Sequence, residues 1–172
     1  WIMAYTTIDD PTIYFNTVLY TGNGSSQSIT GVGFQPDWVW IKQRNEARSH
    51  SIFDVIRGVQ VQLKSNDADA ESTASSFLTA FGTDGFTYGS SDNGNKSSST
   101  YVSWNWKAGG SASSNTDGSI TTSVSANTTA GFSIVSWTGN GTDGASIGHG
   151  LVNPNLSIIK RRDGSGHSWN VN

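Results

Sequence analysis

Short stretches in which apolar and polar residues alternate run along the chain and predict β-strands. The clearest is YVSWNWK at 101–107, in which Val102, Trp104 and Trp106 are predicted to face one side and the polar residues between them the other. Further strands are predicted over 13–21, 37–44, 50–54, 59–63, 77–81, 86–88 and 119–125. Turns rich in Gly, Asn and Ser separate these strands, and no helical period interrupts them. The pattern predicts an all-β fold, an antiparallel β-sandwich.

Two segments of the chain repeat one another. Residues 15–24 read FNTVLYTGNG and residues 132–141 read FSIVSWTGNG, which places Phe15 opposite Phe132 and Tyr20 opposite Trp137. The match continues in order: 38–42 aligns with 156–160, and the pair His-Ser at 50–51 returns at 167–168. A match of this length predicts one module followed by the beginning of a second copy.

The two copies indicate which side of the strand at 37–44 is buried. Trp38 and Trp40 are replaced by the apolar residues Leu156 and Ile158, whereas Val39 is replaced by a serine. The face of Trp38 and Trp40 is therefore predicted to lie in the core. The alternative, a platform on which the two tryptophans stack against sugars, is less favoured. The predicted core and structural residues are Phe15, Trp38, Trp40, Trp104, Trp106, Phe132 and Trp137.

The repeat and the local composition divide the chain into three parts. Residues 1–107 are predicted to form the first β-sandwich module, 108–116 a flexible Gly/Ser linker, and 117–172 the N-terminal half of a second, similar module. Three explanations are open for the half module: a longer native polypeptide, extra strands packed on the first module, or strands that complete a sheet in a neighbouring subunit. Met3 resembles a natural initiator, so the native start is also open.

Composition and charge narrow the class of protein. Aromatic residues make up 11% and include seven Trp, so a real core is expected although charged residues are only 13%. The net charge of −3 gives no basic field for nucleic acid, and the absence of Cys excludes disulfides and thiolate metal sites. No apolar run approaches the roughly 20 residues of a membrane span, and no signal peptide is visible. These features are typical of an extracellular β-protein released by lysis.

Catalytic chemistry finds little support in the sequence. A polysaccharide depolymerase needs two carboxylates roughly 5–10 Å apart across a cleft. Most acidic residues fall in predicted turns, and only Asp37 and Asp54 lie in or beside strands. The second copy replaces them, Asp37 by Asn155 and Asp54 by either Asn170 or Val171, and no Gly-x-Ser-x-Gly elbow occurs. No catalytic or cofactor-binding residue is therefore predicted, and the protein is not expected to be an enzyme.

Calcium is the one cofactor for which the chain offers candidates, because loop carboxylates can bind this ion. The candidate ligands are Asp67, Asp69 and Glu71 in one cluster and Asp92, with Asn93 and Asn95, in another. Ordinary solvated loops are the favoured interpretation of both clusters. No pair of His residues has the spacing of zinc ligands.

Several strings resemble a family of structural and tail-fibre-like proteins of marine bacteriophages. They are YTGNG, QPDWVWIKQR, SHSIFDVIRG, LKSN, FGTDGFTYG, YVSWNWKAGG and NTDGSITTSVSANTTAGFSIVSWTGNG, which cover nearly the whole chain. The resemblance implies tandem jelly-roll sandwiches of the concanavalin or laminin G type, a location in the virion, and a structural or host-adsorption role. The chain departs from the family pattern because it ends inside the second module and begins before the usual Met.

The sequence thus predicts a virion structural protein of a marine phage, a component of an appendage, a fibre or the capsid surface, with a role in host attachment. A glycan-binding, lectin-like adhesin is the alternative, and a depolymerase is the least favoured. The expected partners are the protein itself as a homo-oligomer, other virion proteins and host surface glycans. Self-association is expected because the chain has few charges, no disulfides and an incomplete second module.

Overall fold

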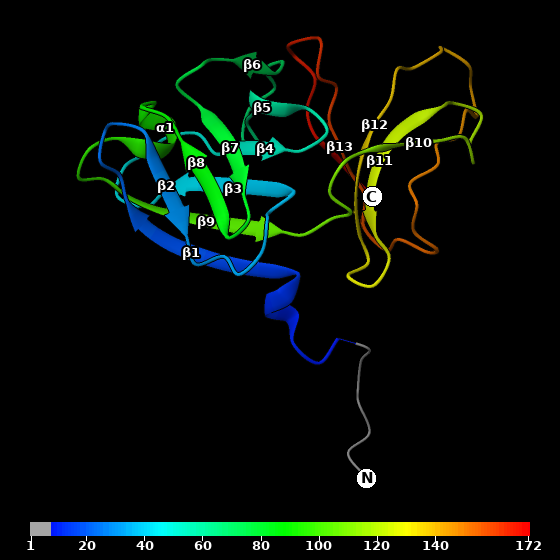
Figure 1. The fold of residues 1–172 in the computed structure, drawn as a ribbon. Helices are drawn as coiled ribbons and strands as arrows, with labels where there is room; N and C mark the ends of the chain where they lie inside the picture. Colours follow the sequence, from blue (N-terminus) through cyan, green and yellow to red (C-terminus); the bar gives the residue numbers. More distant parts are fainter. Residues whose placement is uncertain (1–7) are drawn as a thin grey trace.

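Antiparallel β-sheets are the main regular structure of the protein in the computed structural model, which describes residues 8–172 (Figure 1). The all-β fold predicted from the sequence is confirmed. Met3 and the predicted N-terminal end of the first module lie outside the described residues. Among residues 8–172, no helix has the length and apolar character that crossing a membrane requires.

The first sandwich consists of two sheets and two short helical segments. The larger sheet has the order β1 (Phe15–Thr21), β9 (Thr100–Trp106), β3 (Trp38–Gln43), β4 (Ser51–Asp54), β5 (Gly58–Leu63) and β6 (Ser72–Thr73). The smaller sheet has the order β2 (Gln27–Thr30), β8 (Gly85–Tyr88) and β7 (Leu78–Gly82). The helical segments are η1 (Pro11–Ile13), which precedes β1, and α1 (Asp92–Asn95), which precedes β9. A single apolar cluster between the two sheets forms the core.

The face that the larger sheet turns toward this core differs from the predicted one. On β3, Val39 and Ile41 are fully buried and belong to the core, whereas Trp38 and Trp40 are only partly buried and point to the other side. The prediction that Trp38 and Trp40 face the sandwich core is therefore wrong. The prediction depended on Ser157, which stands at the position of Val39 in the second copy. Ser157 lies beside a two-residue strand in the second half, outside any comparable sandwich.

The same correction applies to other predicted core residues. Trp104 and Trp106 are partly buried on the outer face of β9, where they alternate with buried Ser103 and Asn105. Phe15, in register with Trp106, also lies on this outer face. Trp137 is 36% exposed and has no place in a core. Phe132 is partly buried and packs against the outer face of the first sandwich, as described below.

Asn95 fastens the β1–β2 loop to the β8–β9 loop at the end of the sandwich that carries α1. Its side chain is fully buried. The Oδ1 atom accepts a hydrogen bond from the amide of Asn23 at 2.9 Å, and Nδ2 donates to the carbonyl oxygens of Gly89, at 2.8 Å, and of Ser25. The loop at 90–99 is thus an ordered part of the fold.

The second half of the chain forms two small sheets beside the sandwich (Figure 1). One has the order β10 (Ser113–Asn115), β11 (Thr122–Asn127) and β12 (Phe132–Ser136); the other pairs β13 (Ile158–Ile159) with β14 (Asn170–Val171). The segment 108–116, predicted to be a flexible linker, instead contains β10. Its Gly109 amide donates to Ser125 Oγ at 3.0 Å, and its Gly110 amide donates to Asp37 Oδ2 at 3.0 Å. These bonds attach the segment to both halves.

The repeat places strands at matching positions but does not reproduce the sheet. β12 begins at Phe132 as β1 begins at Phe15, and β13 and β14 fall in the segments that match β3 and β4. In the first sandwich β9 lies between β1 and β3, whereas β12 and β13 belong to separate sheets. Ile158 pairs with Val171, although Trp40, its counterpart, pairs with Ile52. A second copy of the complete sandwich, and a jelly-roll order of strands, remain predictions.

Candidate functional site

The outer face of the larger sheet carries rows of aromatic side chains across β1, β9 and β3. In the first row Phe15 is in register with Trp106, and Trp106 with Trp38. In the next row Trp104 is in register with Trp40. All five side chains are partly buried. We call this surface the aromatic face. Part of it is in contact with the second half of the chain.

The first row of the aromatic face is in contact with the second half of the chain. The Phe132 ring stacks on Trp106, with ring centroids 6.1 Å apart and an interplanar angle of 24°. It also meets Trp38 edge-on at 6.4 Å. Phe15 packs on Trp106 at 4.7 Å from within the same sheet. Trp106 is therefore held between an aromatic ring of its own sandwich and one of the second half.

The second row contains a histidine with a fixed hydrogen bond. Trp40 Nε1 donates to His50 Nδ1 at 2.8 Å, and the Trp40 ring also meets Trp104 edge-on at 5.9 Å. An indole N–H can only donate, so Nδ1 accepts and the ring proton of neutral His50 lies on Nε2. Burial, together with the positive charge of Lys42, lowers the pKa of His50 below its ordinary value. The arrangement disfavours the protonated form of His50.

A bidentate ion pair joins the two halves beside the aromatic contact. Arg162 donates from Nε to Glu71 Oε2 at 2.8 Å and from Nη2 to Oε1 at 3.0 Å. Its Nη1 donates to Ser136 Oγ at 2.7 Å, and the Glu71 amide donates to the Arg162 carbonyl oxygen at 3.0 Å. The hydrogen bonds to Glu71 raise the pKa of Arg162. One side chain thus connects β12, the C-terminal loop and the first sandwich.

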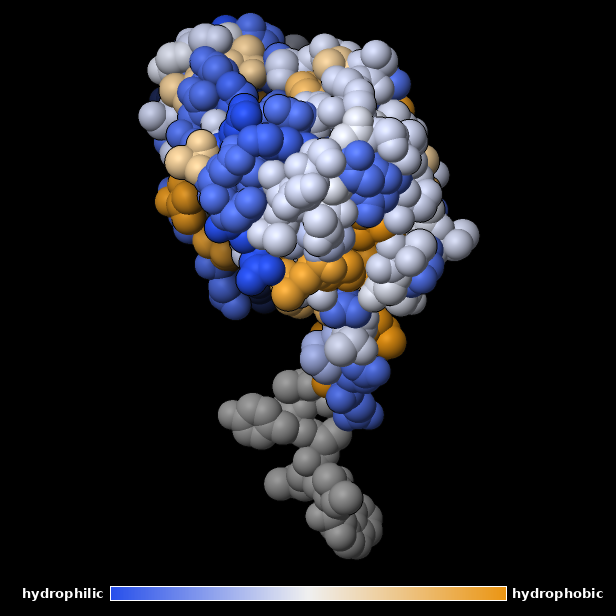
Figure 2. Space-filling model, turned by 90° about the vertical axis from the view of Figure 1, so that its left-hand side faces the viewer, coloured by the Kyte–Doolittle hydropathy of each residue, from blue (hydrophilic) through white to orange (hydrophobic). Residues whose placement is uncertain are grey.

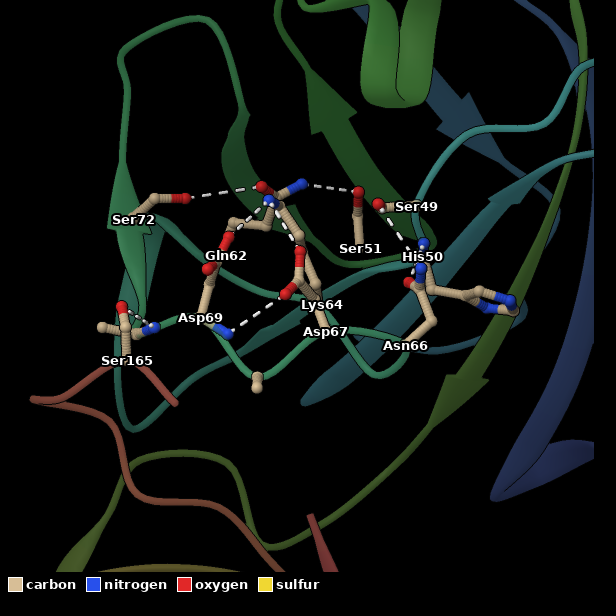
Figure 3. A network of polar contacts seen from close by, with 12 residues as sticks. Ser49, His50, Ser51, Gln62, Lys64, Asn66, Asp67, Asp69, Ser72 and Ser165 are labelled. Atoms are coloured by element: carbon tan, nitrogen blue, oxygen red, sulfur yellow. Dashed lines mark hydrogen bonds and ion pairs between the residues drawn. The ribbon is translucent and has the colours of Figure 1, made fainter. Parts of the chain in front are cut away.

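The loop of the first sandwich that contains Glu71 and the C-terminal loop that contains Arg162 share further polar contacts. Trp169 Nε1 donates to the Lys64 carbonyl oxygen at 2.9 Å, and Lys160 Nζ donates to the Ala68 carbonyl oxygen at 3.1 Å. The amide of Ala70 donates to Ser165 Oγ at 3.2 Å, which Figure 3 shows reaching the loop from a neighbouring segment. We call the whole contact between residues 8–107 and 108–172, aromatic and polar, the junction.

Most of the proposed calcium ligands are bound to basic side chains instead. Lys64 Nζ lies 3.4 Å from Asp67 Oδ2 and 3.1 Å from Asp69 Oδ2, and Figure 3 shows it between the two carboxylates. Glu71 is paired with Arg162, and Asp92 lies 3.6 Å from Arg48. In the described part of the chain, no group of three or more His, Asp or Glu side chains is arranged to hold a metal ion.

The two carboxylates nearest to strands have structural partners. Asp54 and Arg57 form a buried ion pair with 2.6 Å between Oδ2 and Nε, and Asp54 Oδ1 accepts from the amides of Ile56 and Arg57. Asp37 Oδ2 accepts the amide of Gly110 in the linker segment. Asp54 therefore closes the β4–β5 turn, and Asp37 fixes the linker segment.

Sequence reasoning missed the polar residues of the junction, although Trp38, Trp106 and Phe132 of its aromatic part are among the predicted structural residues. The sequence indicates Glu71 only as a candidate calcium ligand and predicts no role for Arg162. No short sequence motif links Glu71 with Arg162, because the two residues lie on different predicted modules. The repeat holds a weak signal for the aromatic part of the junction. It aligns Phe132 with Phe15, and the Phe15 ring packs against Trp106.

Comparison with known proteins assigns a family. The profile described as "Domain of unknown function (DUF7483)" matches residues 10–172, nearly the whole chain, and the chain therefore belongs to this family. No curated protein and no solved structure was found to match.

Proposed function

We propose that this member of the DUF7483 family is a structural module of a bacteriophage particle, a part of an appendage, a fibre or the capsid surface. The observation that carries the proposal is the junction. The two halves are joined through a stacked aromatic pair, a bidentate ion pair and a linker segment whose amides are bound on both sides. A module that must hold its neighbour in a fixed orientation needs such a contact, whereas a catalytic domain on a flexible linker does not.

The chemistry of the described residues agrees with this role. Asp54 closes the β4–β5 turn, Asp37 binds the linker segment, and the buried Asn95 fastens the loops at one end of the sandwich. Stability without disulfides then rests on sheet packing and buried hydrogen bonds. The resemblance of YVSWNWKAGG and the other strings to marine phage structural proteins supports a location in the virion.

The test is detection of the chain in purified particles. Phage particles from the source lysate are banded on a density gradient, and each fraction is digested and analysed by mass spectrometry. Peptides of this chain are expected to follow those of the major capsid protein through the gradient. Peptides that stay in the soluble fraction, together with those of host cytosolic enzymes, would contradict the proposal.

A second function, glycan binding, is favoured by the uncovered part of the aromatic face. Trp40 and Trp104 are partly exposed there, and Lys42 and His50 supply polar groups at their edges. Aromatic rings beside polar groups are suited to stack on the apolar face of a sugar. We therefore propose host-surface glycans as ligands for an adsorption role.

A glycan array tests this second proposal. The protein is expected to bind a set of bacterial surface glycans, and Trp104→Ala is expected to abolish the binding. Trp137→Ala is the matched control, because Trp137 is 36% exposed and lies outside the aromatic face. No glycan bound by the wild-type protein, or equal loss in both variants, would rule the proposal out.

A further inference from the structure

The second half of the chain carries an exposed apolar surface on β13 and β14. Ile158 and Val171 are directly paired, so their side chains share one face, and they are 50% and 63% exposed. Leu156, two residues before Ile158, is 62% exposed. Ser157 and Ile159, which alternate with these residues, are partly buried. We call the surface of Leu156, Ile158 and Val171 the C-terminal face.

By contrast, the opposite end of the molecule is mostly hydrophilic. Figure 2 looks at the end of the first sandwich that lies away from the second half, which is mostly blue and white, with its largest apolar area in the lower part. Clustered apolar side chains on a surface mark sites of protein contact more often than scattered ones do. We therefore expect a protein partner to cover the C-terminal face.

The internal repeat indicates what kind of partner fits. Leu156 and Ile158 occupy the positions of Trp38 and Trp40 in the first copy. In the first copy Trp38 is in contact with Phe132, from the strand that opens the second repeat. The position of Leu156 is thus one that, in the first sandwich, receives an aromatic ring from the following repeat.

The chain also presents the complementary surface. Phe15 is the counterpart of Phe132 and begins β1. Beside it, Ile13 of η1 is 49% exposed, and an apolar cavity of about 190 Å³ is lined by Pro11, Tyr14 and Phe15 together with Trp106 and Phe132. This N-terminal end offers apolar side chains, and a recess beside them, to an apolar surface.

We propose that the C-terminal face binds a second copy of this chain, which covers it with its N-terminal end around Ile13 and Phe15. The contact is head-to-tail, because the two surfaces differ. A head-to-tail contact leaves one free surface of each kind and so extends into a ring or a filament. The inference deepens the proposed structural role by naming the partner.

Sedimentation of two variants and their mixture tests the proposal. The wild-type chain is expected to form dimers and longer species as its concentration rises. Ile158→Lys removes the receiving face and Ile13→Glu removes the inserted end, so each variant alone is expected to associate at least about tenfold more weakly. A 1:1 mixture is expected to form dimers and to stop there, because one intact contact remains between the two variants.

Two controls distinguish this contact from non-specific association and from misfolding of the variants. Val152→Lys changes a side chain that is 88% exposed in the same half but outside β13 and β14, and it is expected to associate like the wild type. Circular dichroism and the thermal midpoint check that each variant folds.

Three results would overturn the inference. The first is a wild-type chain that stays monomeric up to about 1 mM, the weak end of specific association. The second is an Ile13→Glu variant that still associates, which would show a symmetric contact between two C-terminal faces. The third is a mixture without dimers. A chain found in phage particles but monomeric in solution would remove this inference and leave the proposed function standing.

Discussion

Trp106 stacks on Phe132 with ring centroids 6.1 Å apart, and this pair joins the last strand of the first sandwich to the middle of the second half. The contact links two strands that differ in the number of neighbouring strands they pair with. β9 pairs with a strand on each side, β1 and β3, whereas β12 pairs with β11 alone among the described strands. The second half should therefore depend on the first much more than the first depends on the second.

Phe132→Ala should weaken the second half selectively. Loss of a partly buried aromatic ring and its stacking is expected to cost about 1–3 kcal/mol. Urea denaturation is expected to show one transition in the wild type and two in the variant, with residues beyond 108 unfolding first. Phe132→Leu keeps an apolar side chain and should lose less. A single unchanged transition in Phe132→Ala would show that the stack contributes nothing to the junction.

The pair Glu71–Arg162 should show measurable coupling although it is partly exposed. A double-mutant cycle with Glu71→Ala and Arg162→Ala is expected to give about 0.5–1 kcal/mol, at the upper end for surface pairs because the contact is bidentate. Arg161 and Asp163 provide the control, since their side chains are 56% and 80% exposed. That cycle should give a value near zero. Equal coupling in both cycles would argue against a special role for Arg162.

Asp54→Ala should be among the most damaging substitutions in the chain. Asp54 and Arg57 have side chains only 3% and 4% exposed, so the change leaves a buried guanidinium without its counter-ion. A loss of about 3–5 kcal/mol in the free energy of unfolding is expected. Asp67→Ala, which disrupts the more exposed pair with Lys64, should cost less than about 1 kcal/mol. Chemical denaturation of both variants measures the difference.

Stability should depend on pH through His50. Burial lowers the pKa of His50 in the folded protein below its ordinary value of 6.5, so the unfolded chain binds this proton more readily. The contribution is complete above pH 6.5 and is lost as the pH falls through 6.5 toward the lowered pKa. The thermal midpoint should fall over this window, and less so in His50→Gln. An equal fall of the thermal midpoint in His50→Gln and in the wild type would contradict this account.

Asn95→Asp should destabilise the end of the sandwich that carries α1. A carboxylate cannot donate to the carbonyl oxygens of Gly89 and Ser25, and the side chain is fully buried. A loss of about 2–4 kcal/mol is expected, because unpaired polar atoms and a charge would be buried together. Asn93→Asp in the same loop should cost far less. Comparable losses in the two variants, measured by thermal unfolding, would contradict this account of Asn95.

The strands could be predicted from the sequence because their pattern is local. The strand predicted at 101–107 is observed at Thr100–Trp106, and the one predicted at 37–44 is observed at Trp38–Gln43. Alternation could not decide which face of β3 is the core, because both faces are apolar. Only packing distinguishes them: the smaller sheet covers Val39 and Ile41, while Phe132 approaches Trp38.

The candidate site was beyond prediction for a different reason. The pairing of Glu71 with Arg162 depends on how the two halves meet, and neither residue belongs to a motif. The composition of 108–116 is typical of a flexible linker, but a hydrogen bond to a backbone amide leaves no trace in composition. The repeat revealed matching positions, yet the sheets built on them differ.

The central claim is that the junction holds the two halves as one rigid unit, and ¹⁵N relaxation of backbone amides tests it most directly. The rotational correlation time is measured separately for amides of β9 and β3 and for amides of β11 and β12. One common correlation time, matching that of a single 18.3 kDa body, is predicted for the wild-type chain at a concentration at which it is monomeric. Two distinct times, with the second half tumbling faster, would contradict the claim.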